Sequence, residues 1–488
     1  MQISPFDFAI ILLYLASITL FGARFGRGQQ TLRDYFLGGR TAPWWALACS
    51  IVATETSTLT IIGTPAIAYG GSLGFLQLVL GYLVARVILC VVLIPQYFQG
   101  EFYTAYQLLE RRFGVRMRSA AAVTFLVTRA LAEGVRFSAI GKVVSVAFGT
   151  GERLSITVVA VLTLFYTFEG GLRAVIWTDV MQFALYLTGS VAAFSLLLHK
   201  IPGGWPELTR AAAAAGDKLR VFDFTFSLTR SYTFWSGLVG GTFLTMASHG
   251  TDQTMVQRLL AARNERDSKK ALLVSGLIIF GQFTLFLVIG VMLFVHAQLA
   301  AASVPGRDPD RIFPEFIVHE MPIGLKGLVL ASIFAIAMSN ASGSLNSLAS
   351  SSIMDLTPIC HDAGPAQSLG RSRRMTLVWG LLLALLGLVG WGPVLVAGLT
   401  ITSITYGGLL GVFLLGTWNR LANENGALVG FATGIVTMIA VTLLTRLAWT
   451  WYVPVGTIAT FAVGSIGSLA GSTPSSSGAP QQQQLPQD

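Results

Sequence analysis

Long apolar runs, separated by short charged or Gly/Pro-rich breaks, follow one another along most of the chain. A membrane core about 30 Å thick is crossed by about 20 apolar residues in a helix, so each run predicts a membrane-spanning helix. About thirteen such helices are predicted, at residues 5–23, 43–70, 73–97, 117–148, 153–168, 173–199, 231–257, 270–297, 323–357, 373–391, 393–417, 424–446 and 449–470. The pattern therefore predicts an all-α integral membrane protein with one transmembrane domain over residues 1–471.

The composition agrees with a chain that lies in lipid. Of the 488 residues, 53% are hydrophobic and only 11% are charged, against about 25% charged residues in soluble domains. The net charge of +9 comes from short loops and forms no basic stripe with aromatic residues, which argues against nucleic acid as a partner. The three cysteines are unpaired by spacing, so neither a disulfide framework nor a metal site is expected.

The basic loops predict how the chain is oriented, because cytoplasmic loops of membrane proteins carry an excess of Lys and Arg. With the N-terminus outside, the basic segments 24–40, 111–118, 258–270 and 371–374 all fall on the cytoplasmic side of a plasma membrane. The outside loop near 200–230 is also basic, but longer loops follow the rule poorly. The low-complexity residues 472–488 are expected to form a disordered cytoplasmic tail.

Polar clusters interrupt two of the predicted helices. The run 43–70 would be about 42 Å long as a straight helix, and its middle reads TETSTLT, with Glu55. The segment near 242–257 reads TFLTMASHGTDQTMVQ and contains His249 and Asp252. Ser and Thr in membrane helices often only bond back to carbonyls or join helices together, but a carboxylate in each cluster favours a functional role.

The two interrupted helices stand at corresponding places in the chain. When the first helix is set aside, the next ten divide into two sets of five, at about 43–199 and 231–417, and each set begins with an interrupted helix. Paired interruptions of this kind indicate an inverted-repeat transporter, in which unwound segments offer carbonyls to cations and helix ends to substrates. An odd number of helices in each half inverts one half relative to the other.

A third polar cluster, SNASGSLNSLASSS, begins at Ser339. On a helix, Ser339, Ser342 and Asn346 share a face. Their oxygens would suit a sodium ion, with carbonyls of an unwound helix completing its shell. The alternative is a packing interface of small residues.

Ionisable residues also lie inside predicted spans, where they are costly and usually face a cavity or a partner. These residues are Arg86, Arg129, Glu133, Arg136 and Asp179. Glu133 and Arg136 are three residues apart and can pair on one helix. Arg86 has no local partner, so Glu55, Asp252 or an anionic solute is expected to neutralise it. No catalytic triad or phosphate loop is recognisable, so neither an enzyme nor an ATP-driven pump is expected.

Five segments resemble, in order, the motifs of one transporter family. They read GGRTAPWWALACSIVATETS, TAYQLLERRFG, YTFEGGLRAVIWTDVMQ, GTDQTMVQRLLAA, and AMSNASGSLNS followed by MDL. Through them the chain resembles the sodium/solute symporter family, which includes the sodium/glucose, sialic acid, proline and iodide cotransporters. The resemblance implies the LeuT-type five-plus-five inverted repeat, with extra helices at about 424–470 and alternating access driven by the sodium gradient.

The resemblance also implies where sodium binds. The main site would use the carbonyls of Ala53, Thr56 and Ile336 and the side chains of Ser339 and Asn340. The family commonly has a second hydroxyl where this chain has Asn340, so the geometry must adjust to an amide oxygen.

A second sodium site, which only some members have, would use Asp179, Ser339, Ser342 and a hydroxyl at the position of Gly343. One or two sodium ions per cycle therefore stays open, with Asp179 expected as a coupling or structural group. Proton coupling and the oligomeric state, monomer included, also stay open.

The solute is expected near the two interruptions. The candidate residues are Glu55, Thr58, Thr60, Arg86, Glu133, Arg136, His249, Asp252 and Gln253. Sugar-transporting members carry Gln and Glu where this chain has Leu59 and Thr60, so their pattern is missing. Arginines at 86 and 136 suit a carboxylate-bearing solute. If Glu55 and Glu133 neutralise them, a neutral sugar or polyol is the alternative, and a solute channel or a sensor are lesser ones.

Overall fold

The computed structural model describes residues 3–26, 32–158, 171–299, 308–356, 365–389, 391 and 393–470. Its long helices occupy the predicted apolar runs. They are α1 (Pro5–Gly26), α3 (Trp44–Glu55), α4 (Thr58–Gly70), α5 (Leu76–Val92), α8 (Val115–Phe148), α10 (Gly171–Lys200), α12 (Phe234–Gly250), α13 (Gln253–Leu260), α14 (Glu265–Leu299), α16 (Leu325–Met354), α17 (Pro365–Gly387), α18 (Val394–Trp418), α19 (Glu424–Leu444) and α20 (Tyr452–Ala470).

Two predicted segments fall wholly or partly outside the described residues. The run at 153–168 is helical over residues 152–158 and then leaves them. The predicted tail at 472–488 lies outside them altogether.

The count of about thirteen spans is not confirmed. Among the described residues, seven helices are long and apolar enough to cross a membrane, and the bent pair α3 and α4 makes an eighth. Some of the other runs are helical but too polar to meet that measure; α8, for example, carries Arg129, Glu133, Arg136 and Lys142 along its length. These charges need partners inside the protein, so the charged face of α8 turns inward, whereas Val123 and Val127 on the same helix are exposed.

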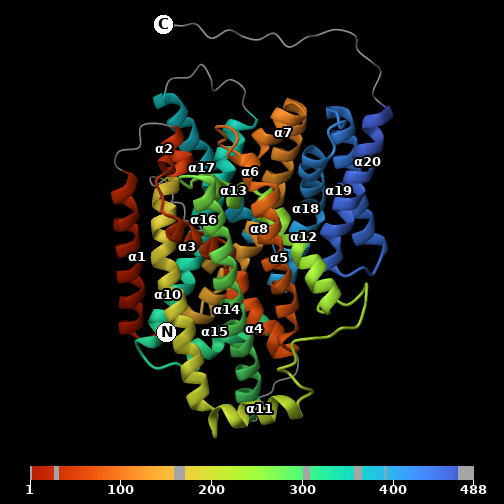
Figure 1. Ribbon diagram of the computed structural model, residues 1–488. Helices are drawn as coiled ribbons and strands as arrows, with labels where there is room; N and C mark the ends of the chain where they lie inside the picture. The colour runs from red at the N-terminus through yellow and green to blue at the C-terminus, as the bar shows by residue number, and fades with distance from the viewer. Residues whose placement is uncertain are drawn as a thin grey trace.

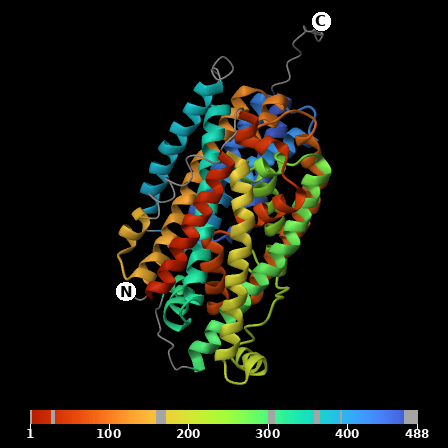
Figure 2. The same cartoon turned by 90° about the vertical axis from the view of Figure 1, so that its left-hand side faces the viewer.

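The long helices lie side by side in one bundle (Figures 1 and 2). In Figure 1, α1 forms one edge and α19 and α20 form the other, while the short helix α11 (Gly204–Ala214) lies across one end. The short helices α6 (Ile94–Tyr97) and α7 (Tyr106–Arg112) lie toward the opposite end. We refer to these as the α11 end and the α7 end.

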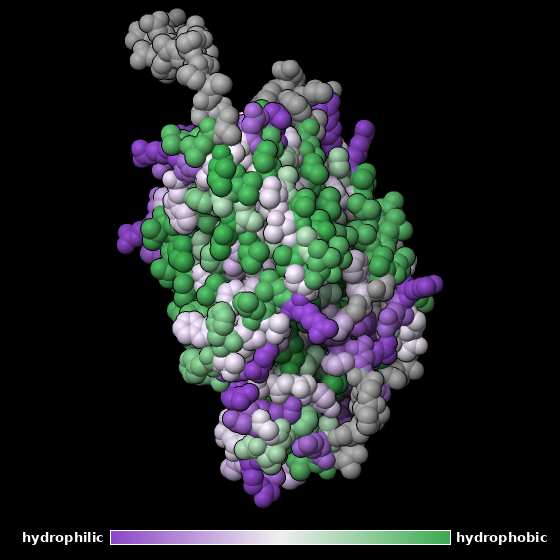
Figure 3. All heavy atoms as spheres, turned by 90° about the vertical axis from the view of Figure 1, so that its right-hand side faces the viewer, coloured by the Kyte–Doolittle hydropathy of each residue, from purple (hydrophilic) through white to green (hydrophobic). Residues whose placement is uncertain are grey.

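The outer surface of the bundle is apolar along its sides. Figure 3 shows hydrophobic residues over much of one face, with hydrophilic residues gathered toward the ends. On α19 and α20, Val436, Leu443, Ile458 and Ile466 are each more than 60% exposed. An apolar surface of this extent fits contact with lipid chains.

The centre of the bundle is built around the interrupted helices. Helices α3 and α4 pack against α14, and α3 also packs against α10. Helix α12 packs against α5, and glycines let the two backbones touch: a Cβ at Gly241 would lie 2.2 Å from the carbonyl oxygen of Leu78, and one at Gly81 would lie 2.6 Å from that of Leu238. Small residues permit this close approach in membrane helices, and it fixes the second interrupted helix against α5.

Candidate functional site

The first interruption leaves two backbone carbonyls without helical partners. Helix α3 ends at Glu55 and α4 begins at Thr58, with a bend of 61° between them. The amide of Ser57 would bond to the carbonyl of Ala53 in a continuous helix, but it donates to Oγ1 of Thr60 at 3.2 Å. The amide of Thr60 donates to the carbonyl of Ser57 at 2.9 Å. The carbonyls of Ala53 and Thr56 are therefore free to accept other partners.

These two carbonyls meet a third one from α16 at a single point. Nδ2 of Asn340 lies 3.5 Å from the carbonyl oxygen of Ala53, 3.0 Å from that of Thr56 and 3.0 Å from that of Ile336. The hydroxyl of Thr56 points elsewhere and accepts from Nε2 of Gln282 at 2.7 Å. The structure thus brings the predicted sodium carbonyls together, and the Asn340 amide donates to all three.

The fourth predicted ligand, Ser339, directly precedes Asn340 on α16, and its hydroxyl contacts Asp179. The Ser339 hydroxyl donates to Asp179, which also accepts from the hydroxyl of Ser50 at 2.5 Å and from Nη2 of Arg258 at 3.2 Å. A serine hydroxyl that donates its proton keeps lone pairs for a cation. Ser339 is therefore placed to join the main site to the buried Asp179.

The residues predicted for a second sodium site surround a guanidinium group. Nη2 of Arg258 lies 2.8 Å from where a Cβ at position 343 would be, so the absence of a side chain at Gly343 makes room for it. The hydroxyl of Ser342 turns to its own helix and donates to the carbonyl of Ser339 at 3.0 Å. The permanent positive charge of Arg258 therefore already stands beside Asp179.

The second interruption is closed by side chains. Asp252 begins α13 as its N-cap and accepts from the amide of Thr254 at 2.8 Å. It also accepts from the hydroxyl of Tyr406 at 2.7 Å. At the end of α12, the carbonyl of Gly250 accepts from the hydroxyl of Tyr97 at 2.6 Å.

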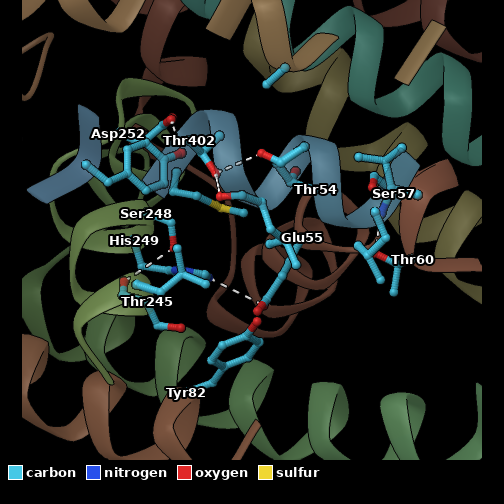
Figure 4. Close-up of a pocket in the computed structure, with 18 of the residues that line it drawn as sticks. Thr54, Glu55, Ser57, Thr60, Tyr82, Thr245, Ser248, His249, Asp252 and Thr402 are labelled. Carbon is cyan, nitrogen blue, oxygen red and sulfur yellow. Dashed lines mark hydrogen bonds and ion pairs between the residues drawn. The ribbon is translucent and has the colours of Figure 1, made fainter. Parts of the chain in front are cut away.

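A cavity lies between the two interruptions. Its volume is about 120 Å³, below the roughly 300–1,000 Å³ of most small-molecule pockets, and it is lined by residues of α3, α4, α5, α8, α12, α13, α14 and α18. Figure 4 shows Glu55 and His249 pointing toward each other across it, with Thr60 and Asp252 also in its wall. This is the candidate solute site.

Arg86 lies outside the cavity lining, and its side chain is 1% exposed. It forms an ion pair with Glu55, donates to the carbonyl of Tyr82 at 3.1 Å, and lies 3.3 Å from Nε2 of His249. Nε2 of His249 is 3.4 Å from the Glu55 carboxylate. Glu55, rather than a solute, therefore balances the charge of Arg86.

The charges on α8 are arranged differently. Glu133 pairs with both Arg129, at 3.0 Å, and Arg136, and it accepts from the Ser344 hydroxyl at 2.6 Å. Arg129 donates twice to the same hydroxyl, at 2.9 and 2.6 Å. Arg136 lines the cavity, and its Nε has no hydrogen-bond partner among the described residues. Arg129 lines the cavity as well, but of the arginines considered Arg136 has a buried donor without a partner among the described residues.

Four of the predicted solute residues do not line the cavity, and Arg86 is one of them. Thr58 and Glu133 line a smaller cavity beside it. Gln253 accepts from the amide of Ala105 at 2.8 Å and donates to the carbonyl of Tyr103 at 3.1 Å, so it ties α13 to the loop before α7.

Residue-by-residue reasoning missed several residues of the cavity wall. Among them are Phe75, Tyr82, Phe283, Thr402 and Tyr406. Nothing in the sequence distinguishes such aromatic or hydroxyl residues from those that pack elsewhere in an apolar helix. Their roles depend on which face of each helix turns inward.

A second and wider cavity lies toward the α11 end. Its volume is about 580 Å³, and Gly74 and Gln77, on either side of Phe75 in sequence, line it. Phe75 stacks on Phe283 at 5.4 Å between ring centroids, and both line the solute cavity. At the α7 end, the contacts of Tyr97 and Gln253 hold the second interruption against α6 and α7.

The fold and the site together define a secondary transporter. The sequence agrees: a model of the sodium:solute symporter family matches residues 35–434, and the chain belongs to that family. It is therefore a sodium-coupled symporter, and a transporter rather than an enzyme.

Relatives match along nearly the whole chain. The sodium/sialic acid symporter SiaT of Proteus mirabilis is 30% identical over 489 residues, covering 96% of each chain. The human sodium/iodide cotransporter is 30% identical over 92% of this chain and 70% of its own. Human sodium-coupled monocarboxylate transporter 2 is 28% identical over 88% of this chain and 70% of its own.

Solved structures agree on the fold. A sodium-coupled sialic acid symporter in a substrate-bound, outward-open state superposes with a TM-score of 0.89 at 29% identity, over 96% of this chain and 98% of its own. MhsT in complex with L-phenylalanine gives 0.51 at 14% identity, over 87% of this chain and 97% of its own, which bears on the fold alone. The predicted LeuT-type fold is confirmed.

Proposed function

We propose that this symporter imports a small carboxylate-bearing solute together with sodium by alternating access. The observation that carries the proposal is Arg136, which lines the solute cavity with an unpaired Nε and shares its one ion-pair partner, Glu133, with Arg129. The single carboxylate of Glu133 faces the two guanidinium groups of Arg129 and Arg136, so a second carboxylate would balance the remaining positive charge. Arginine binds carboxylates in a charge-assisted, often bidentate way.

The remaining polar wall suits hydroxyl groups on the same solute. Glu55, Thr60, Ser248 and Asp252 all line the cavity and can accept or donate hydrogen bonds. The relatives described above are named for sialic acid, iodide and monocarboxylates, and each of these solutes is an anion. A hydroxylated acid meets both the arginine and the polar wall.

A neutral sugar or polyol is the alternative. Arg136 already pairs with Glu133, and Arg86 with Glu55, so both charges have a carboxylate beside them. A neutral solute would then need only the hydroxyl and carboxylate groups of the wall.

We place sodium at the carbonyls of Ala53, Thr56 and Ile336, with the side-chain oxygens of Ser339 and Asn340. Convergence of the three carbonyls on one donor supports this, because a point that attracts amide hydrogens also attracts a cation. We further propose one sodium ion per cycle, since Arg258 supplies the positive charge beside Asp179. Asp179 then serves as a structural partner that holds Ser339.

The orientation, with the N-terminus outside and the C-terminus cytoplasmic in the plasma membrane, is part of the proposal. In that orientation the α11 end faces outward, and the wider cavity at that end becomes the entrance for solute. The contacts of Tyr97 and Gln253 at the α7 end then close the cytoplasmic side. The protein is taken to work as a single chain, because both interruptions and the cavity are formed within it.

Uptake into liposomes that contain the purified protein tests the solute class. The panel holds sialic acid, glucuronate, lactate, glucose and proline, each with and without an inward sodium gradient. We expect an acid to accumulate only with the gradient, and to exchange for itself in a counterflow assay, which a channel does not support. Sodium-driven accumulation of glucose in preference to every acid would contradict the proposal.

Variants of Arg136 sharpen the test. Arg136→Gln should lower the affinity for the acid at least about tenfold, because it removes a charge-assisted hydrogen bond, while Arg136→Lys should lose less. Arg210→Gln is the matched control, because Arg210 is 79% exposed and pairs only with Glu207 among the described residues. Equal uptake by the Gln variant and the control would remove Arg136 from the solute site.

A further inference from the structure

Asn340 is buried between the three carbonyls described above and a small cavity. Its side chain is 2% exposed. Nδ2 faces the carbonyls of Ala53, Thr56 and Ile336, whereas Oδ1 has no hydrogen-bond partner among the described residues. Most buried polar atoms do have a partner, so the orphaned oxygen requires an explanation.

A second buried atom without a partner in the described part of the chain belongs to another residue that lines the small cavity. Asn340, Arg136, Thr58 and Glu133 all line it, and it is about the size that one water molecule needs. Arg136 also has a buried atom without a partner among the described residues, the donor Nε. Two residues that border the same space, one from the ion site and one from the solute cavity, therefore carry an unpaired acceptor and an unpaired donor.

We propose that the Asn340 amide couples the ion site to Arg136 by a half-turn about its last side-chain torsion. Without sodium, Nδ2 holds the three carbonyls and Oδ1 faces the small cavity, where it attracts the Nε–H of Arg136. Sodium at the carbonyls repels the amide hydrogens. The half-turn then brings Oδ1 to the ion and places Nδ2 in the cavity.

The half-turn changes what Arg136 meets. With Oδ1 in the cavity, Arg136 faces an acceptor and is held on that side. With Nδ2 there, a donor faces a donor, and the guanidinium is released toward a solute carboxylate. Sodium then raises the affinity for the solute, and the solute raises that for sodium by the same factor. This consequence depends on the proposed solute, whereas the coupling of sodium to Arg136 depends only on the proposed sodium site.

A hydroxyl at position 340 has one polar atom, where the amide has two. Serine or threonine could meet the carbonyls with its single oxygen, but neither has a separate donor and acceptor for the two sides. The amide therefore allows one residue to interact with both the sodium site and Arg136.

A double-mutant cycle with sodium as the only probe tests the coupling. Sodium affinity is measured from thermal stabilisation of the purified full-length chain, with choline replacing sodium. Arg136→Gln should strengthen sodium binding about threefold or more, because it removes the group that favours the sodium-free amide. In the Asn340→Ser background the same change should leave sodium affinity unaltered, giving a clear coupling between the two positions.

Asn340→Thr repeats the cycle in case the serine variant does not fold. Ser350→Ala is the control, because Ser350 is buried on α16 and is not among the wall residues of the small cavity. In that background Arg136→Gln should keep its full effect. Equal effects of Arg136→Gln in the native, Asn340→Ser and Asn340→Thr backgrounds, or no effect in any, would overturn the proposal. That result would leave the solute class untouched, since the uptake panel decides it separately.

Discussion

The two places where a cation is expected differ in what the protein itself puts there. At the carbonyls of Ala53, Thr56 and Ile336 stands a neutral amide from Asn340, which an ion can displace. Beside Asp179 stands the guanidinium of Arg258, whose charge is permanent and which is 1% exposed. Both places are lined by oxygen atoms, but we expect only the first to exchange its occupant for sodium.

The difference follows from single residues. Gly343 leaves the space that Arg258 fills, since a Cβ there would lie 2.8 Å from Nη2. Asn340 replaces a hydroxyl with a group that carries both a donor and an acceptor. Gly343 thus favours a fixed charge beside Asp179, whereas Asn340 favours a polar group that can turn.

The largest expected effect comes from removing the carboxylate beside Arg258. Asp179→Asn leaves a buried guanidinium without its ionic partner, which costs about 3–5 kcal/mol when a buried pair is broken. We expect a strong fall in the melting temperature of the purified protein and in the amount that reaches the membrane. A variant as stable as the native chain would show that Arg258 is not held by this pair.

The next effect concerns the space beside Arg258. Gly343→Ser restores the hydroxyl that a second sodium site requires, but its Cβ crowds the guanidinium, so about 1–3 kcal/mol of stability should be lost. Gly343→Ala separates crowding from the hydroxyl. The ratio of sodium to solute transported should stay the same in whichever variant folds; a rise by one sodium ion would show that the fixed charge had been displaced.

The smallest effect separates two serines of α16. Ser339→Ala should weaken sodium binding about tenfold, or about 1.4 kcal/mol, because its oxygen is a proposed ligand. Ser342→Ala is the control, because its hydroxyl donates to the carbonyl of Ser339 and should change sodium affinity by less than twofold. Thermal stabilisation by sodium measures both affinities. Equal losses of sodium affinity in the two variants would indicate that the ion lies closer to Asp179 than proposed.

The chain's organisation along the sequence was predictable because its signals are local. Apolar runs of the length that crosses a membrane predicted the helices, and the clusters around Glu55 and Asp252 predicted both interruptions. The family was recognisable from five motifs in order. The count of spans was less predictable, because charged interior helices such as α8 and apolar lipid-facing helices both read as apolar runs.

Part of the candidate site also followed from the sequence. The pairing of Glu133 with Arg136 was expected from their spacing, and that of Arg86 with Glu55 was one of three alternatives for Arg86. Gln253 was expected near the solute, but it bonds to the loop before α7 instead. Its place depends on a turn between α12 and α13 that spacing along the chain does not describe.

By itself, then, the sequence determined that this is a membrane transporter with two interrupted helices and polar groups in its interior. Residue type and spacing suffice for that, because burial in lipid penalises every unpaired polar group wherever it lies. Only the tertiary structure decided that Glu55 is the partner of Arg86 and that Asn340 and Arg136 border one cavity. The second relation joins residues about two hundred positions apart, and both depend on which helix faces meet.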